Sequence, residues 1–132
     1  MEQRKALFVD ADRLSLDIYA SRFSTAGYES ATADSSEAAL TMVRGGYAPD
    51  IIFVEASMPG MDGIELLEAL RSEGLAPDAA IVFLANHADA VRVSRAHELG
   101  ADGYIVKASA IPSEIVAEAD KIYKHKRRAR RT

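Results

Sequence analysis

Four short runs of apolar residues recur along the chain without polar interruption. They cover residues 6–9 (ALFV), 51–54 (IIFV), 80–84 (AIVFL) and 104–106 (YIV). An unbroken apolar run of this length predicts a strand that is buried on both faces, as in a parallel sheet covered by helices. A fifth segment, YESATA at 28–33, mixes polar and apolar residues and predicts a strand at the sheet edge.

Segments with helical periodicity separate these runs. We predict helices from about residue 12 to 26, from after 34 to 45, from 62 to 74, from about 89 to 99, and from Pro112 onward. Proline is favoured in the first turn of a helix, where its missing N–H group has no intrahelical partner. The pattern therefore predicts five helices in alternation with five strands.

Helix boundaries are indicated by capping residues and by glycine. Asp34 is followed three residues later by Glu37, and Asp62 is followed three residues later by Glu65, as in a capping box. Gly27 follows the first predicted helix and is suited to the left-handed conformation that ends many helices.

The alternation predicts the fold class. A strand–helix repeat of this kind, (βα)5, forms a parallel sheet with helices on both faces, which is a three-layer α/β/α sandwich. In such folds the functional crevice lies beyond the carboxyl ends of the strands. Candidate functional residues are therefore those that directly follow each strand.

Length and composition agree with one small domain. The chain has 132 residues, no cysteine and 48% apolar residues. Without cysteine it has no disulfide and no thiolate metal ligand, as is typical of a reducing cytoplasm, where we expect the protein to act. No apolar run approaches the roughly 20 residues that a membrane span requires.

Charge is unevenly distributed along the chain. Residues 1–120 hold all 20 acidic residues and 9 of the 16 basic residues, for a formal charge of −11. Residues 121–132 hold seven basic residues and no acidic one, for a charge of +7. We expect one domain at 1–124 followed by a basic tail or linker at 125–132, and we do not expect the acidic part of the chain to bind nucleic acid.

The strand ends bring polar side chains to one rim of the sheet. Asp10 and Asp12 follow the first strand, Glu55 and Ser57 follow the third, and Lys107 follows the fifth. Buried carboxylates are costly unless they are paired or used. Two interpretations remain open: a structural ion pair at the sheet edge, or a functional site derived from several strands.

Three segments make the chain resemble a known family. LFVDAD (7–12), PDIIFVEASMPGMDGIELLEALR (49–71) and ELGADGYIVKA (98–108) are similar to the receiver domain of bacterial response regulators, the CheY-like fold. The resemblance extends from residue 4 to about 124, and it implies a flavodoxin-like sheet of order 2-1-3-4-5.

The resemblance also implies a phosphoacceptor site, from which this chain departs. In that family an aspartate after the third strand accepts a phosphoryl group from a histidine kinase, and two adjacent acids after the first strand help to bind Mg²⁺. Glu55 stands at the acceptor position, Asp10 at the first acid and Ala11 at the second. Asp10, Glu55 and the Ser57 carbonyl are the remaining possible ligands, and we expect no bound metal. Asp12 either caps the first helix or serves as a displaced ligand.

Switch residues of the family are partly retained. The resemblance places Ala85 where a Ser or Thr hydroxyl normally contacts the phosphoryl group, whereas Tyr104 and Lys107 match the family. Glu55 is one methylene longer than aspartate, so we expect its carboxylate to reach Lys107. Ala108 replaces the usual proline, and a cis bond before it would cost about 2.5–4 kcal/mol, so we expect a trans bond.

These departures predict a receiver domain of two-component phosphorelay signalling with a degenerate acidic site and no enzymatic turnover. We expect it to act by phosphorylation-independent protein–protein contact through the fourth helix, fifth strand and fifth helix, with a histidine kinase or effector domain as partner. One alternative is a working phosphoacceptor that uses Mg²⁺ and an unusual carboxylate.

The basic end has several possible roles. It can extend the fifth helix, with Asp120 and Lys124 as a pair four residues apart. It can be a linker, contact an acidic partner or membrane surface, or contact nucleic acid without sequence specificity. The last role is a second alternative for the function of the chain.

Overall fold

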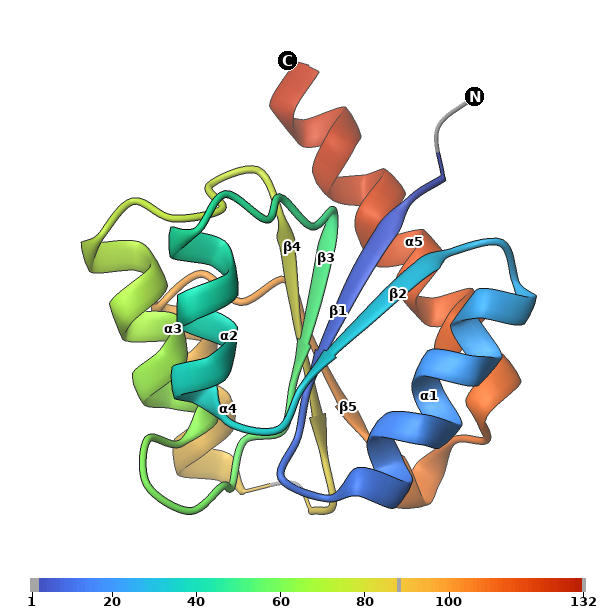
Figure 1. Ribbon diagram of the computed structural model, residues 1–132, viewed down its shortest axis with the longest axis horizontal. Helices are drawn as coiled ribbons and strands as arrows, with labels where there is room; N and C mark the ends of the chain where they lie inside the picture. The colour runs from blue at the N-terminus through green and yellow to red at the C-terminus, as the bar shows by residue number, and fades with distance from the viewer. Residues whose placement is uncertain (1–2, 88, 132) are drawn as a thin grey trace.

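A computed structural model of the protein describes residues 3–87 and 89–131. Strands and helices alternate along the chain, as the sequence predicted (Figure 1). Their bounds are β1 (Lys5–Val9), α1 (Arg13–Thr25), β2 (Glu29–Ala33), α2 (Ser36–Arg44), β3 (Ile51–Val54), α3 (Gly63–Ser72), β4 (Ala80–Ala85), α4 (Ala90–Glu98), β5 (Gly103–Val106), the 3₁₀ turn η1 (Lys107–Ser109) and α5 (Pro112–Arg131).

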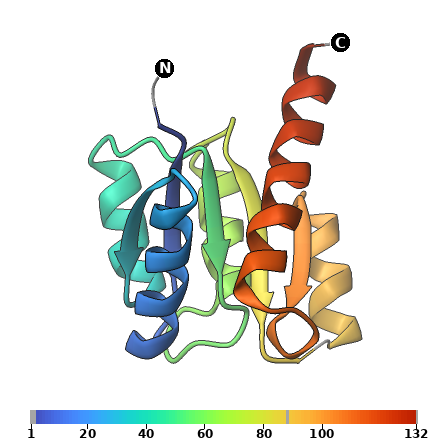
Figure 2. The same ribbon diagram turned by 90° about the vertical axis from the view of Figure 1, so that its right-hand side faces the viewer.

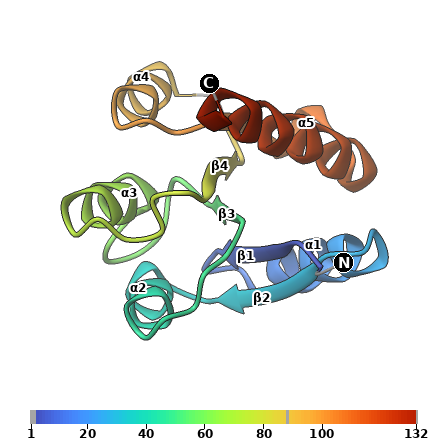
Figure 3. The same ribbon diagram turned by 90° about the horizontal axis from the view of Figure 1, so that it is seen from above.

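The five strands form one parallel sheet in the order β2-β1-β3-β4-β5. Helices α1 and α5 lie on one face, and α2, α3 and α4 lie on the other (Figures 1 and 3). The three-layer flavodoxin-like fold predicted from the sequence is therefore confirmed.

Each face of the sheet has its own apolar core. Leu7 and Val9 of β1 pack with the core under α2 and α3, whereas Ala6 and Phe8 pack with the core under α1 and α5. Successive side chains of a strand point to opposite faces, so both sets of positions must be apolar when both faces are covered. This burial explains why the strands appear in the sequence as continuous apolar runs.

One predicted helix boundary was wrong by a residue. Ser35, and not Asp34, caps α2: its backbone is extended and its hydroxyl accepts a hydrogen bond from the N–H of Ala38. The capping box of Asp62 and Glu65 at α3 is confirmed, with both reciprocal hydrogen bonds present. Gly27 has φ of 97° and ends α1 as expected.

Helix α5 includes most of the basic end. It continues to Arg131 and extends past the amino ends of the strands (Figures 1 and 2). The Lys126 ammonium donates to the Ala79 carbonyl at 2.8 Å and to Asp102 at 3.0 Å. Residue 132 lies outside the described residues. Within the described residues, no helix has the length and apolar character that crossing a bilayer would require.

A second contact group holds the middle of α5. Asp120 accepts hydrogen bonds from the Arg4 guanidinium at 2.9 Å and from the Tyr28 hydroxyl. The Arg4 guanidinium also lies 4.2 Å from the centre of the Tyr123 ring. The expected pairing of Asp120 with Lys124 was therefore wrong, because Arg4, directly before β1, presents its guanidinium to Asp120 whereas Lys124 is exposed.

Candidate functional site at the carboxyl ends of the strands

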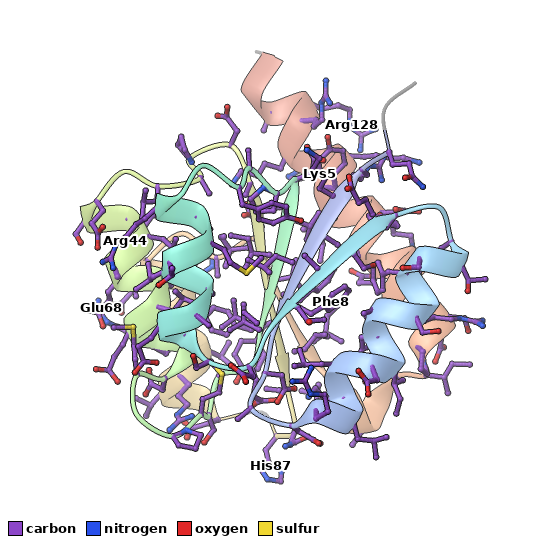
Figure 4. All side chains as sticks on the ribbon, viewed as in Figure 1. Lys5, Phe8, Arg44, Glu68, His87 and Arg128 are labelled. Carbon is purple, nitrogen blue, oxygen red and sulfur yellow. The ribbon has the colours of Figure 1, made fainter. Side chains whose placement is uncertain are left out.

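The loops that follow β1, β3, β4 and β5 meet at one end of the molecule. This end is at the bottom of Figure 1, and Figure 4 shows His87 on it, pointing outward. The end holds the sequence-predicted residues Asp10, Glu55 and Lys107, because parallel strands place their carboxyl ends at the same edge.

Lys107 links the two acidic strand ends. Its Nζ atom lies 2.8 Å from Oδ2 of Asp10 and 3.1 Å from Oε2 of Glu55. The three side chains are only 12%, 13% and 6% exposed, in the order Lys107, Asp10 and Glu55. The predicted contact between Glu55 and Lys107 is present, and the sequence did not indicate that Asp10 lies closer to the ammonium.

The electrostatics of this triad keep Lys107 charged. Burial alone lowers the pKa of an ammonium group, but the hydrogen bond and charge of Asp10, together with those of Glu55, outweigh it. The pKa of Lys107 is therefore raised. The Lys107 ammonium also lies 5.7 Å from the centre of the Tyr19 ring, and burial raises the pKa of that phenol.

Backbone groups orient both carboxylates. The N–H of Asp12 donates to Oδ1 of Asp10 at 2.9 Å, and the N–H of Ser57 donates to Oε1 of Glu55 at 3.3 Å. Gly63 begins α3 directly against this loop, where a Cβ atom would lie 2.5 Å from the Glu55 carbonyl oxygen. The loop that carries Glu55 is therefore packed too closely for a side chain at position 63.

Asp12 serves as the N-cap of α1. Its Oδ1 accepts from the N–H of Leu14 at 3.0 Å, and its Oδ2 accepts from the hydroxyl of Ser15 at 3.1 Å. Of the two roles left open by the sequence, capping is the one that this geometry supports. Ala11, at the neighbouring position, is exposed and supplies no side-chain oxygen.

The other two switch positions, Ala85 and Tyr104, line a cleft together with Glu55. Ala85 ends β4 and is 2% exposed. Tyr104 of β5 stacks on Phe83 with ring centres 5.7 Å apart. Burial raises the pKa of Tyr104, the charges of Glu55 and Asp89 raise it further, and the charge of Arg92 on α4 opposes them.

Comparison with known proteins decides the family. Residues 6–120 match the model of the response regulator receiver domain. The chain belongs to the response regulator receiver domain family.

Curated relatives agree with this assignment. The receiver domain is 33% identical over 115 residues to the DNA-binding response regulator MtrA of Mycobacterium tuberculosis, covering 87% of the chain and 48% of the relative. It is 34% identical over 107 residues to the probable transcriptional regulator ycf27 of Cyanophora paradoxa, covering 81% and 43%. The chain thus spans about half the length of the curated relatives it matches.

Solved structures share the fold. The chemotaxis protein CheY4 of Vibrio cholerae superposes with a TM-score of 0.84 at 24% sequence identity. The match covers 92% of this chain and 99% of CheY4. A CheY-like receiver domain protein from Methanospirillum hungatei superposes with a TM-score of 0.87 at 21% identity, covering 97% and 99% of the two chains.

Receiver domains act in two-component signalling and normally bind Mg²⁺ at this end of the sheet. Within residues 3–87 and 89–131, no group of three or more His, Cys, Asp or Glu residues gathers in a metal-binding arrangement. The carboxylates that do converge here, Asp10 and Glu55, both face the Lys107 ammonium.

Sequence reasoning missed two residues of the site. Tyr19 lies on α1 at the Lys107 ammonium, and Arg92 lies on α4 beside the Tyr104 phenol. Neither residue follows a strand, so the rule that selected the strand ends could not find them. The helical period of α1 could have indicated Tyr19. Residues three or four apart share a helix face, and Tyr19 lies four residues after Ser15 and three after the buried Leu16.

Proposed function

We propose that this receiver domain takes part in two-component signalling through protein–protein contact, in a conformation that does not depend on phosphorylation. It has no catalytic turnover of its own in this proposal. It acts in the cytoplasm, where receiver domains ordinarily meet their partners.

One observation carries the proposal: the Lys107 ammonium already bridges Asp10 and Glu55. In the family this lysine pairs with the oxygens of the transferred phosphoryl group. Here the longer Glu55 side chain brings a permanent carboxylate to the same cation. An attraction of this kind amounts to about 4 kcal/mol at 4 Å and an effective dielectric of 20, before desolvation is subtracted.

The donor set supports the proposal because it does not fit Mg²⁺. That ion requires a near-octahedral set of oxygens at about 2.0–2.1 Å. Ala11 offers no oxygen from its side chain, Asp12 is engaged as a helix cap, and Asp10 and Glu55 face an ammonium. Asp10 and Glu55 already share the Lys107 ammonium. Of the three metal ligands that the sequence suggested, only the Ser57 carbonyl is then left.

The residues that would respond to a phosphoryl group, Ala85 and Tyr104, also support the proposal. Ala85 has no hydroxyl that a phosphoryl group could draw inward, so a modification at Glu55 lacks the usual connection to Tyr104. Within the described residues the Tyr104 hydroxyl makes no hydrogen bond, and its ring is held by stacking on Phe83.

The partner surface in this proposal is the face formed by α4, β5 and α5. Helix α4 buries Ala96 alone and leaves Val91 78% exposed. A helix with so little buried area can adapt to a partner at small cost. The mycobacterial relatives are named DNA-binding response regulators and are about twice as long, so an effector domain or a histidine kinase is the class of partner that we propose.

Phosphorylation chemistry tests the proposal directly. The protein is incubated with acetyl phosphate and Mg²⁺, or with beryllofluoride and Mg²⁺, beside a receiver domain that has an aspartate acceptor as the positive control. We expect no phosphoryl adduct by intact mass and no saturable change in the ¹H–¹⁵N spectrum. An adduct on Asp10 or Glu55, or saturable Mg²⁺ binding, would establish instead a working phosphoacceptor.

A further inference from the structure

A polar cleft of about 290 Å³ lies beside the triad, between the ends of β3 and β4, the first turn of α4, and β5. Its wall includes Glu55, Ala85, Asp89, Arg92 and Tyr104. Ala85 contributes an apolar side chain to the wall, and Asn86 and His87 line the cleft beside it. The volume is close to the lower end of the roughly 300–1,000 Å³ that is usual for small-molecule sites.

Arg92 supplies an unpaired cation in this cleft. Its side chain is half-buried, and it forms no hydrogen bond or ion pair with any described residue. The next arginine of the same helix, Arg95, instead pairs with Glu68 at 3.3 Å and Glu98 at 3.4 Å. A guanidinium presents paired N–H donors that match the two oxygens of a carboxylate.

Two carboxylates face the same space. Oδ1 of Asp89 accepts from the N–H groups of Val91 and Arg92, and Oε1 of Glu55 accepts from Ser57. An ionised carboxylate has about four acceptor positions, so both groups keep acceptor capacity. The Oε2 atom of Glu55 is buried and lies 3.1 Å from the Lys107 ammonium.

The mixed charge of the cleft selects among ligand types. A simple anion would pair with Arg92 but would meet the charges of Glu55 and Asp89, and a simple cation would meet Arg92. A molecule that carries both charges can pair its anionic group with Arg92 and its cationic group with Glu55 and Asp89. It thereby avoids placing like charges side by side, which costs several kcal/mol.

We propose that this cleft binds a small zwitterion of the α-amino-acid class, with its carboxylate on Arg92 and its ammonium toward Glu55 and Asp89. The proposal rests on the phosphate-independent function above, because the ligand would take the regulatory place that phosphate has in other receivers.

Binding at this position would act on α4. The far end of that helix is held by the Arg71 guanidinium, which donates to the carbonyls of Leu99 at 3.1 Å and Gly100 at 2.9 Å. The near end carries Arg92, and no hydrogen bond or ion pair joins it to α3 among residues 3–87 and 89–131. A ligand that joins Arg92 to Glu55 therefore ties the first turn of α4 to the end of β3 and sets the angle of the proposed partner surface.

The test is a titration of the whole chain, followed in ¹H–¹⁵N spectra, with glycine, L-alanine and L-glutamate as probes. Acetate and methylammonium serve as probes of single charge. We expect saturable shifts at residues of the cleft for at least one amino acid, and binding weaker by about tenfold or more for acetate and methylammonium.

Variants locate the binding. Arg92→Gln is expected to weaken it by about tenfold or more, and Arg92→Lys to restore part of it. Arg95→Gln, on the same helix but paired outside the cleft, is the control and should bind as wild type. The proposal fails if no amino acid gives a saturable shift, if acetate binds as tightly as the amino acids, or if the Arg95 variant loses binding equally. A phosphoryl adduct in the acetyl phosphate assay would refute the phosphate-independent function separately, whatever the titration shows.

Discussion

The Nζ atom of Lys107 lies 2.8 Å from Oδ2 of Asp10, although 97 positions separate the two residues in the sequence. This contact joins the end of β1 to the end of β5 across the middle of the sheet. Together with Glu55 it places two carboxylates and one ammonium in a region that is mostly closed to solvent. Removing one member of such a group leaves a buried charge without its counter-charge and destabilises the fold. The first prediction follows from this.

Replacing Lys107 by Met should lower the free energy of unfolding by about 2–3 kcal/mol, because two buried carboxylates lose their counter-charge. Urea denaturation at pH 7 measures the change. Lys121→Met, at an exposed lysine of α5, is the matched control and should stay within about 0.5 kcal/mol of wild type. If both variants are equally stable, the ion pairs contribute nothing.

The raised pKa of Lys107 predicts the pH range of this effect. A lysine whose pKa is higher in the folded state contributes its full stabilisation below the pKa of the unfolded chain, about 10.4, and loses it as the pH rises through the folded value. The stability difference between wild type and Lys107→Met should therefore be constant from pH 7 to about 10 and shrink above it. A difference that shrinks already between pH 7 and 9 would contradict this assignment.

Tyr28→Phe tests the attachment of α5 to the residue that directly precedes β2. Burial and the hydrogen bond to Asp120 raise the pKa of Tyr28 to about 12, so its phenol stays protonated well above the ordinary value of 10. Since the folded state holds this proton more tightly, the contribution of Tyr28 is complete below about pH 10 and is lost as the pH approaches 12.

Ultraviolet titration should show a tyrosine that ionises near pH 12 in wild type and in Tyr104→Phe, but not in Tyr28→Phe. The Tyr28 variant should also lose about 1–2 kcal/mol of stability at pH 7, because Asp120 loses a hydrogen-bond donor. Persistence of the phase near pH 12 in the Tyr28 variant would assign it to another residue.

Lys126→Met tests whether the first part of the basic end belongs to the folded domain. Its ammonium bonds the Ala79 carbonyl and Asp102, so the substitution should cost about 1–2 kcal/mol in thermal or urea unfolding. Arg128→Met is the matched control: Arg128 is exposed, on the part of α5 that extends past the sheet (Figure 4), and its loss should change stability by less than about 0.5 kcal/mol. Equal effects would show that Lys126 is not an anchor.

Restoring the oxygens of the family site should restore metal binding. In the triple variant Ala11→Asp, Glu55→Asp, Ala85→Thr, a second carboxylate stands beside Asp10 and the shorter acceptor withdraws from Lys107. We expect saturable Mg²⁺ binding in ¹H–¹⁵N spectra of the triple variant and none for Ala85→Thr alone. Failure of the triple variant, with the fold intact, would mean that the backbone at this end differs from that of metal-binding receivers.

Much of the fold could be predicted because its signals are local. The runs at 6–9 and 51–54 are strands within a residue of their predicted bounds, and Asp62 with Glu65 forms the predicted capping box. Each signal depends on the burial or hydrogen bonding of a few consecutive residues. Even so, Ser35 replaced Asp34 as a cap, because both residues can accept the same kind of bond and the local backbone decides between them.

The candidate site could be predicted in outline. Strands of a parallel sheet directly precede Asp10, Glu55 and Lys107. The strand order alone therefore predicts that these three residues lie at one edge of the sheet. Their pairing needs more: the closer approach of Lys107 to Asp10 depends on the spacing of β1, β3 and β5 and on the rotamers that packing permits.

By itself the sequence determined the five strands, the five helices and the parallel sheet, and it supplied Ala11, Glu55 and Ala85, on which the proposed departure from the family rests. The tertiary structure alone decided which partner each charged side chain takes: Asp120 with Arg4, Lys126 with Asp102, and Arg92 without an ionic partner among the described residues. The physical reason is range. Periodicity and capping act over a few residues along the chain, whereas an ion pair depends on atoms brought within about 4 Å by the packing of distant elements.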